Sequence, residues 1–138
     1  MKFDFIENRG FISGGILNFT PKEIFELCSK GAIIVDVRSE YVNKSRKFKV
    51  DNVLYFPLDK LEQTYTELPK DKLLIFADSV GLRSKEAVIL LKEKAIENIA
   101  NMAGGLVEWE RDGLPIEIDL SEQLTGSCMC QLKNRNKK

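Results

Sequence analysis

A buried-strand pattern followed directly by a helical pattern, in residues 73–94, constrains the fold more than any other stretch of the chain. Leu73 to Ala77 form a continuous apolar run, of the length expected for a strand buried on both faces. Residues 78–83 are too few for anything except a tight loop. Apolar residues then recur at helical spacing from Ser84 onward, at Ala87, Leu90, Leu91 and Ala95. A strand, a tight loop and a helix in this order direct backbone N–H groups toward one point, which favours an anion site.

The loop itself consists of six residues whose types suit such a site. Gly81 permits an unusual backbone φ angle, and Arg83 would place a fork of guanidinium donors at the rim. The loop residues, all candidates for ligand contact, are Asp78, Ser79, Val80, Gly81, Leu82 and Arg83.

The rest of the chain alternates strand and helix patterns. Strands are predicted at residues 32–37, 53–56 and 98–102. Thr20 and Glu23 form a capping box, with Pro21 at the first helical position, so a helix is predicted to begin there. Short helical segments are predicted at residues 58–68 and after residue 104, the latter with Trp109 as a core anchor. This alternation predicts an α/β domain with a central, mainly parallel sheet and helices on both faces.

Composition and charge exclude several classes of function. The 21 basic residues balance the 21 acidic ones, so no strong field is expected to attract nucleic acid or an anionic membrane. No apolar run approaches the length of a membrane span, and acidic residues near the start do not fit a signal peptide, so a cytoplasmic protein is expected. The absence of histidine excludes mechanisms and metal sites that need an imidazole. We expect no metal and no cofactor.

Several segments resemble the rhodanese-like domains of the sulfurtransferase superfamily, in the same order along the chain. They are GAIIVDVRSEY, YFPLDKLEQ, LPKDKLLIF, the loop DSVGLRS and NMAGGLVEWERDGLPIE. The resemblance covers residues 20–117, which are expected to form a single rhodanese-like domain. Residues 1–19 are expected to be an N-terminal arm packed along it, with a dimer or partner contact as the alternative, and residues 118–138 are expected to be a C-terminal tail.

The resemblance places Asp78 where the family has its nucleophilic cysteine. The reaction that it implies is sulfur transfer, in which a thiolate held by the loop amides carries sulfur as a persulfide. A carboxylate forms no persulfide, and Asp78 is expected to accept the loop N–H groups with its own oxygens. No catalytic residue is therefore expected in the loop. The favoured hypothesis is a binding or regulatory module for an unknown protein partner or a sulfur-containing small molecule.

Two other hypotheses remain open. Sulfur or redox chemistry could reside on Cys128 and Cys130 in the tail, because a flexible tether from Pro115 spans on the order of 20 Å and would reach the mouth of the loop. Two thiolates alone do not complete a zinc site. A phosphatase relative is the least favoured, since that chemistry also needs the cysteine. The third cysteine, Cys28, is expected to be a small core residue.

Two charged regions are expected to be structural. Asp36 and Arg38 follow a buried strand, and we expect them to satisfy neighbouring loops, because a buried charge needs partners. Residues 39–51 are polar and basic, and we expect their basic side chains to form a solvated face, with a docking surface as the alternative; these are Lys44, Arg46, Lys47 and Lys49.

Overall fold

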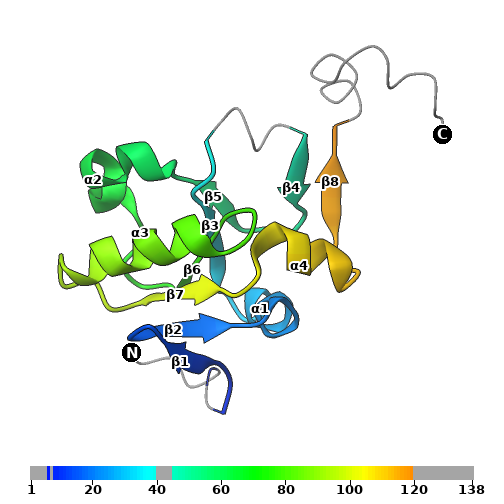
Figure 1. Cartoon of the computed structure of the whole chain (residues 1–138), viewed down its shortest axis with the longest axis horizontal. Helices are drawn as coiled ribbons and strands as arrows, with labels where there is room; N and C mark the ends of the chain where they lie inside the picture. Colours follow the sequence, from blue (N-terminus) through cyan, green and yellow to red (C-terminus); the bar gives the residue numbers. More distant parts are fainter. Residues whose placement is uncertain (1–5, 7, 40–44, 120–138) are drawn as a thin grey trace.

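The structure, a computed structural model, describes residue 6 and residues 8–39 and 45–119. Its centre is a six-stranded sheet with the strand order β1-β2-β7-β6-β3-β5. β1 runs antiparallel to β2, and the other neighbouring pairs are parallel (Figure 1). The strands are β1 (Phe11–Ser13), β2 (Ile16–Phe19), β3 (Ile33–Asp36), β5 (Val53–Tyr55), β6 (Leu74–Ala77) and β7 (Ile99–Met102).

Helices cover both faces of this sheet, as the alternating pattern predicted. α1 (Pro21–Cys28) and α4 (Gly105–Arg111) enclose one core with one set of strand side chains, which includes Ile75 and Trp109. α2 (Leu61–Thr64), between the short turns η2 (Leu58–Lys60) and η3 (Tyr65–Glu67), and α3 (Leu82–Lys92) enclose the second core. Leu74 and Phe76 belong to this second core, because successive strand residues point to opposite faces. The prediction of an α/β fold is confirmed.

The N-terminal segment is more than a packed arm. From Phe11 onward it forms the β1–β2 hairpin, in which Gly14 and Gly15 make the two-residue turn at φ angles of 63° and 79°. β2 pairs with β7 inside the main sheet, and Phe19 is fully buried there. The sequence pattern did not predict this hairpin, because its strands are short and are separated by glycines.

The basic side chains of Arg46, Lys47 and Lys49 are at least partly exposed, but the segment that carries them also forms a strand with a buried residue. β4 (Arg46–Phe48) pairs with β8 (Ile116–Ile118) in a small antiparallel sheet. Phe48 is buried, and its ring lies 5.2 Å from that of Trp109. β8 ends at Ile118, one residue into the predicted tail. Basic and apolar residues alternate from Lys47 to Val50, and this alternation places the Phe48 side chain in the core although the segment is polar overall.

The observed start of α1 agrees with the start predicted from the sequence, whereas both ends of α3 differ from the prediction. The capping box is present at α1, where the Thr20 side chain accepts from the Glu23 N–H group and the Glu23 carboxylate accepts from the Thr20 N–H group. α3 begins at Leu82 rather than Ser84, so the last two predicted loop residues form its first turn. α3 also ends at Lys92, and Ala95 lies beyond it at a φ of 64°. No helix in the described part of the chain is long and apolar enough to cross a membrane.

Candidate anion-binding loop

Asp78 is the first residue of the loop between β6 and α3, at the carboxyl end of the parallel strands. Its side chain is buried, and both of its carboxylate oxygens accept backbone N–H groups. The Gly81 N–H donates to Oδ1, and the Arg83 N–H donates to Oδ2 at 2.8 Å. Arg83 lies in the first turn of α3, where backbone N–H groups have no partner within the helix. The loop therefore holds a negative charge supplied by its own first residue.

The backbone of the loop reaches this shape because two positions carry no side chain. Gly81 has a φ of 97°, in the left-handed region, and turns the chain into α3. Gly105 faces the loop from α4, and a Cβ atom there would lie 2.5 Å from the carbonyl carbon and oxygen of Ser79. Because these contacts are with backbone atoms, no side chain is tolerated without moving the loop.

The N-terminus of α4 donates hydrogen bonds to the backbone of the loop. The Leu106 N–H donates to the carbonyl of Asp78 at 2.9 Å, and the Val107 N–H donates to that of Ser79 at 3.0 Å. Two helices thus contribute N–H groups to one short segment, α3 to the Asp78 carboxylate and α4 to the loop carbonyls. Gly105, which the sequence analysis used only as part of a helix start, is what allows α4 to approach this closely.

A buried chain of hydrogen bonds begins at Ser84, whose hydroxyl lies beside Asp78, and crosses the sheet to the hairpin. The Ser84 Oγ lies 3.3 Å from Asp78 Oδ1 and 2.5 Å from Asn101 Oδ1. Asn101 Nδ2 donates to Asn18 Oδ1 at 2.9 Å, and Asn18 Nδ2 donates to the carbonyls of Ile16 and Ser13. Because those carbonyls only accept, they fix the orientation of both amides and leave Asn101 Oδ1 to accept from Ser84.

The sequence analysis did not identify this chain of polar side chains. Ser84, Asn101 and Asn18 are all buried, although serine and asparagine are mostly exposed. Asn101 interrupts the apolar run of β7, and Asn18 interrupts that of β2. A polar residue inside each strand was the one available signal, but the sequence alone does not place the two strands side by side.

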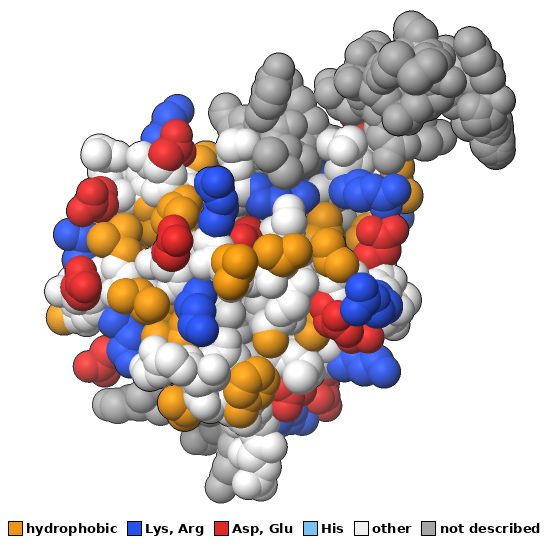
Figure 2. All heavy atoms as spheres, viewed as in Figure 1, with side chains coloured by type: hydrophobic (Ala, Val, Ile, Leu, Met, Phe, Trp, Pro, Cys, Tyr) orange, Lys and Arg blue, Asp and Glu red, His pale blue; other side chains and the backbone are white. Residues whose placement is uncertain are grey.

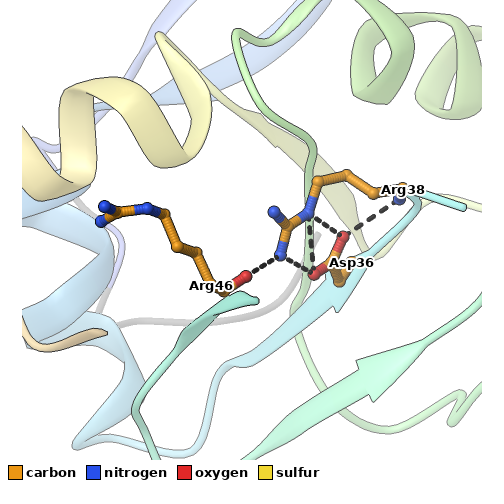
Figure 3. Close-up of polar contacts among 3 residues, drawn as sticks. All are labelled: Asp36, Arg38 and Arg46. Carbon is orange, nitrogen blue, oxygen red and sulfur yellow. Dashed lines mark hydrogen bonds and ion pairs between the residues drawn. The ribbon is translucent and has the colours of Figure 1, made fainter. Parts of the chain in front are cut away.

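Asp36 and Arg38 form a second buried polar group, one strand away from the loop (Figure 3). The Arg38 guanidinium donates through Nε to both oxygens of Asp36, at 3.1 and 3.2 Å, and through Nη2 to Oδ2 at 2.8 Å. Nη2 also donates to the carbonyl of Arg46 at 2.7 Å, which ties the end of β3 to β4. The sequence-based expectation of a structural role agrees with these contacts.

The mouth of the loop opens into a pocket of about 330 Å³. Its rim combines apolar and cationic side chains, since Val80, Leu82 and Arg83 are all exposed. Val107 is exposed beside Ser79, and Figure 2 shows hydrophobic side chains crossing the middle of this face. A larger cavity, of about 600 Å³, lies at the opposite end of β6 and β7 and is lined by residues outside the loop. The smaller pocket, at the mouth of the loop, is lined by Arg38, Ser39, Asp78, Ser79, Val80, Leu82 and Arg83.

Comparison with known proteins identifies the fold family. The family model of the rhodanese-like domain matches residues 20–112, which is most of the chain. The chain belongs to the rhodanese-like domain family. Among curated relatives, a thiosulfate sulfurtransferase, GlpE, from Haemophilus influenzae is 28% identical over 102 residues, which cover 71% of this chain and 91% of that protein. A sulfurtransferase from Allochromatium vinosum is 26% identical over 88 residues, covering 64% of this chain and 80% of that protein.

Solved structures agree on the fold of this rhodanese-like domain. A rhodanese-like domain protein from Staphylococcus aureus matches with a TM-score of 0.63 and 25% identity, over 74% of this chain and 97% of that one. The rhodanese-like domain of an Anabaena protein matches with a TM-score of 0.66 and 18% identity, over 80% of this chain and 86% of that one. The resemblance first seen in the sequence is therefore confirmed as membership of the family.

The cysteines of this rhodanese-like domain lie away from the loop or outside the described residues. Cys28, at the end of α1, packs partly against the first core, and burial raises the pKa of its thiol to about 11. It is therefore a poor nucleophile at neutral pH. Cys128 and Cys130 lie outside the described residues, so their proposed sulfur chemistry stays a prediction. Within residues 8–39 and 45–119, no group of three or more acidic or cysteine side chains is placed to hold a metal ion.

Proposed function

We propose that this rhodanese-like domain is a binding module that does not transfer sulfur at its loop. Asp78 is proposed to stand at the position of the family's nucleophilic cysteine. The observation that carries the proposal is the pair of hydrogen bonds from the Gly81 and Arg83 N–H groups to the two oxygens of Asp78. In an active loop, the same donors would stabilise a thiolate or a persulfide anion.

The chemistry of a carboxylate supports this proposal. In the family's reaction, a thiolate attacks the outer sulfur of thiosulfate, a sulfur–sulfur bond breaks, and sulfite leaves. A persulfide anion remains, and cyanide then removes its terminal sulfur as thiocyanate and restores the thiolate. A carboxylate is a poor nucleophile toward sulfur and holds no sulfur in this way. Asp78 also fills the anion position with its own oxygens, which disfavours binding of an anionic sulfur donor there.

The proposed ligand contacts lie on the rim of the pocket rather than at its floor. Leu82 is 68% exposed and Val80 is 52% exposed, and Arg83 offers its guanidinium beside them. Exposed apolar side chains around a cation are typical of protein interaction sites, where arginine and apolar residues are enriched. We therefore propose a protein partner that contributes an apolar side chain next to a carboxylate.

A sulfur-transfer assay with thiosulfate and cyanide tests the loss of activity. The chain as it stands is expected to form no thiocyanate above background, and Asp78→Cys is expected to gain turnover, because the loop amides would then face a thiolate. Asp78→Ser serves as the matched control, since it changes the same side chain without introducing a thiol. Turnover by the unchanged chain would contradict the proposal.

The tail cysteines require a separate control. The assay is repeated with Cys128→Ser and Cys130→Ser combined in the chain that retains Asp78. Turnover that disappears in this double variant would assign sulfur chemistry to the tail and reject the binding-module proposal. Turnover that survives would show that the loop itself is active, which also rejects it.

The rim is tested by substitution of its most exposed apolar residue. Leu82→Glu is expected to weaken capture of the partner by at least about tenfold, because it opposes the proposed apolar and acidic partner surface. Ile118→Glu introduces the same side chain at another exposed apolar position, on β8, and is expected to leave capture unchanged. Equal losses from both variants would count against the rim as the contact site.

A further inference from the structure

The two edges of the main sheet differ in how well they are protected from pairing with another strand. At the β5 edge, Lys47 Nζ lies 5.9 Å from the centre of the Tyr55 ring, and Asp51 lies just before the strand. Charged side chains at an edge oppose pairing with a further strand. β1, at the other edge, contains Phe11, Ile12 and Ser13 and has no charged residue. Phe11 is 46% exposed and Ile12 is 70% exposed.

The register of the hairpin shows which backbone groups of β1 face outward. In a hairpin with a two-residue turn, the flanking residues, here Ser13 and Ile16, form a hydrogen-bonded pair. Bonded and non-bonded pairs alternate along antiparallel strands, so Ile12 and Leu17 form a non-bonded pair. The N–H and C=O groups of Ile12 therefore point away from β2, toward the outer side of the last strand that the described residues form.

We propose that β1 pairs with β1 of a second copy of this chain, antiparallel and centred on Ile12. A two-fold axis at this residue lets the two Ile12 residues exchange both of their backbone hydrogen bonds. The surrounding sequence, Gly10-Phe11-Ile12-Ser13-Gly14, suits this register. Glycine faces glycine, the large Phe11 faces the small Ser13 of the second copy, and isoleucine faces isoleucine. This fit to itself favours a second copy over an unrelated strand.

α3 adds an apolar border to the same edge. Lys92 Nζ donates to the carbonyl of Gly15 at 3.0 Å, and the Lys85 side chain lies against Gly14. Ile89 lies between these two lysines at helical spacing, so it shares the face of α3 that approaches the hairpin. It is 42% exposed. Ile12 is paired with Leu17, which packs on the face of the sheet covered by α1, so in the paired state the two Ile12 side chains would meet on that face. Ile89 of α3 would border the new strand pair on the opposite face.

The inferred dimer is weak, and it does not depend on the proposed function. A pair of three-residue strands buries less surface than a permanent interface needs, so the dimer is expected to form in the range from tens of micromolar to about 1 mM. Pairing at β1 leaves the loop between β6 and α3 open, because the loop lies at the carboxyl ends of the central strands. A dimer would therefore present two loops to a partner, which strengthens binding to a partner with two sites.

Sedimentation equilibrium of the full chain, from about 10 µM to 1 mM, tests the inference. The unchanged chain is expected to shift from monomer to dimer, and Ile12→Lys is expected to weaken association by at least about tenfold. Leu82→Lys is the matched control, because Leu82 has nearly the same exposure and lies in the first turn of α3 rather than in β1. Circular dichroism checks that both variants fold. A chain that stays monomeric throughout, or a dimer that Ile12→Lys leaves intact, would overturn the inference.

Disulfide trapping tests the register independently of dimer strength. In a background where Cys28, Cys128 and Cys130 are changed to serine, Ile12→Cys is expected to form a disulfide-linked dimer under mild oxidation. Paired residues of antiparallel strands have Cα atoms about 4.5–5.5 Å apart, within the range of a disulfide. A mixture of Phe11→Cys and Ser13→Cys chains is expected to form the mixed dimer in preference to either homodimer. Trapping that is no faster for Ile12→Cys than for Leu82→Cys would overturn the inference.

Discussion

Two buried aspartates end neighbouring strands of this domain and are stabilised in different ways. Asp36 is the last residue of β3 and is paired in register with Ala77, the residue before Asp78. Asp36 is bound by the Arg38 guanidinium and by the Arg38 N–H group. Asp78 accepts from the Gly81 and Arg83 N–H groups and contacts the Ser84 hydroxyl. One carboxylate is therefore compensated by a side-chain cation and the other mainly by backbone dipoles.

This difference determines which polar group loses its partner when one of the side chains is removed. Removal of the Arg38 side chain would leave a fully buried carboxylate without its cation. Removal of the Asp78 side chain would leave N–H groups that point into a small pocket, where water or a dissolved anion can satisfy them. The backbone donors persist in every loop variant that keeps the fold. The comparison therefore suggests that the Asp36–Arg38 pair is the more sensitive to mutation, and that the Asp78 loop remains an anion site.

The largest expected effect is that of Arg38→Met, which replaces the guanidinium by an apolar side chain of similar length. The cost should be about 3–5 kcal/mol of unfolding free energy, because the buried Asp36 loses its compensating charge. Chemical denaturation measures it. The double variant Asp36→Leu, Arg38→Met removes both charges and should recover at least half of this loss. A cost below about 1 kcal/mol for Arg38→Met would remove the contrast between the two aspartates.

Asp78→Ala is expected to cost less, about 1–3 kcal/mol, because it leaves N–H donors unsatisfied but no uncompensated charge. The variant should then be stabilised by added sulfate or thiosulfate, since an anion that binds only the folded state raises its stability. Thermal denaturation of the variant and of the unchanged chain, each with and without the anion, measures the effect. Equal shifts in both proteins would show that the anion acts elsewhere.

Ser84→Ala tests the polar chain that links the loop to the hairpin. It leaves the Oδ1 atom of the buried Asn101 without a donor and removes a contact of Asp78, so a cost of about 1–2 kcal/mol is expected. Ser84→Cys has a similar volume and a weaker donor, and should cost less than alanine. Hydrogen exchange of the Gly81 and Arg83 N–H groups should be faster in Ser84→Ala. Unchanged exchange at these two groups would show that Ser84 does not help to hold the loop.

The sequence predicted the parts of the fold that depend on local pattern. The buried strands, the capping box at Thr20 and the hydrogen bonds from the loop to Asp78 all follow from residues close together in the chain. The β1–β2 hairpin was missed because its strands are short and its pairing with β7 joins residues far apart. For the same reason the Ser84–Asn101–Asn18 chain was not predicted, since each residue is polar in isolation and is explained only by its neighbours in space.

Cys28 extends the comparison to a half-buried ionisable group, whose thiol is shifted by burial alone. Burial raises the pKa of its thiol from 9.0 to about 11, so the folded state retains a proton that the unfolded chain loses. Its stabilising contribution is complete below about pH 9 and is lost as the pH rises through 11. Denaturation from pH 8 to 11 should show a steeper loss of stability for the unchanged chain than for Cys28→Ala, which has no proton to lose at this position. The raised pKa also lowers the thiolate fraction at pH 8, so iodoacetamide should modify Cys28 more slowly than a free cysteine peptide. Parallel stability curves for the two proteins, together with rapid alkylation of Cys28 in the folded chain, would show that burial does not protect this thiol.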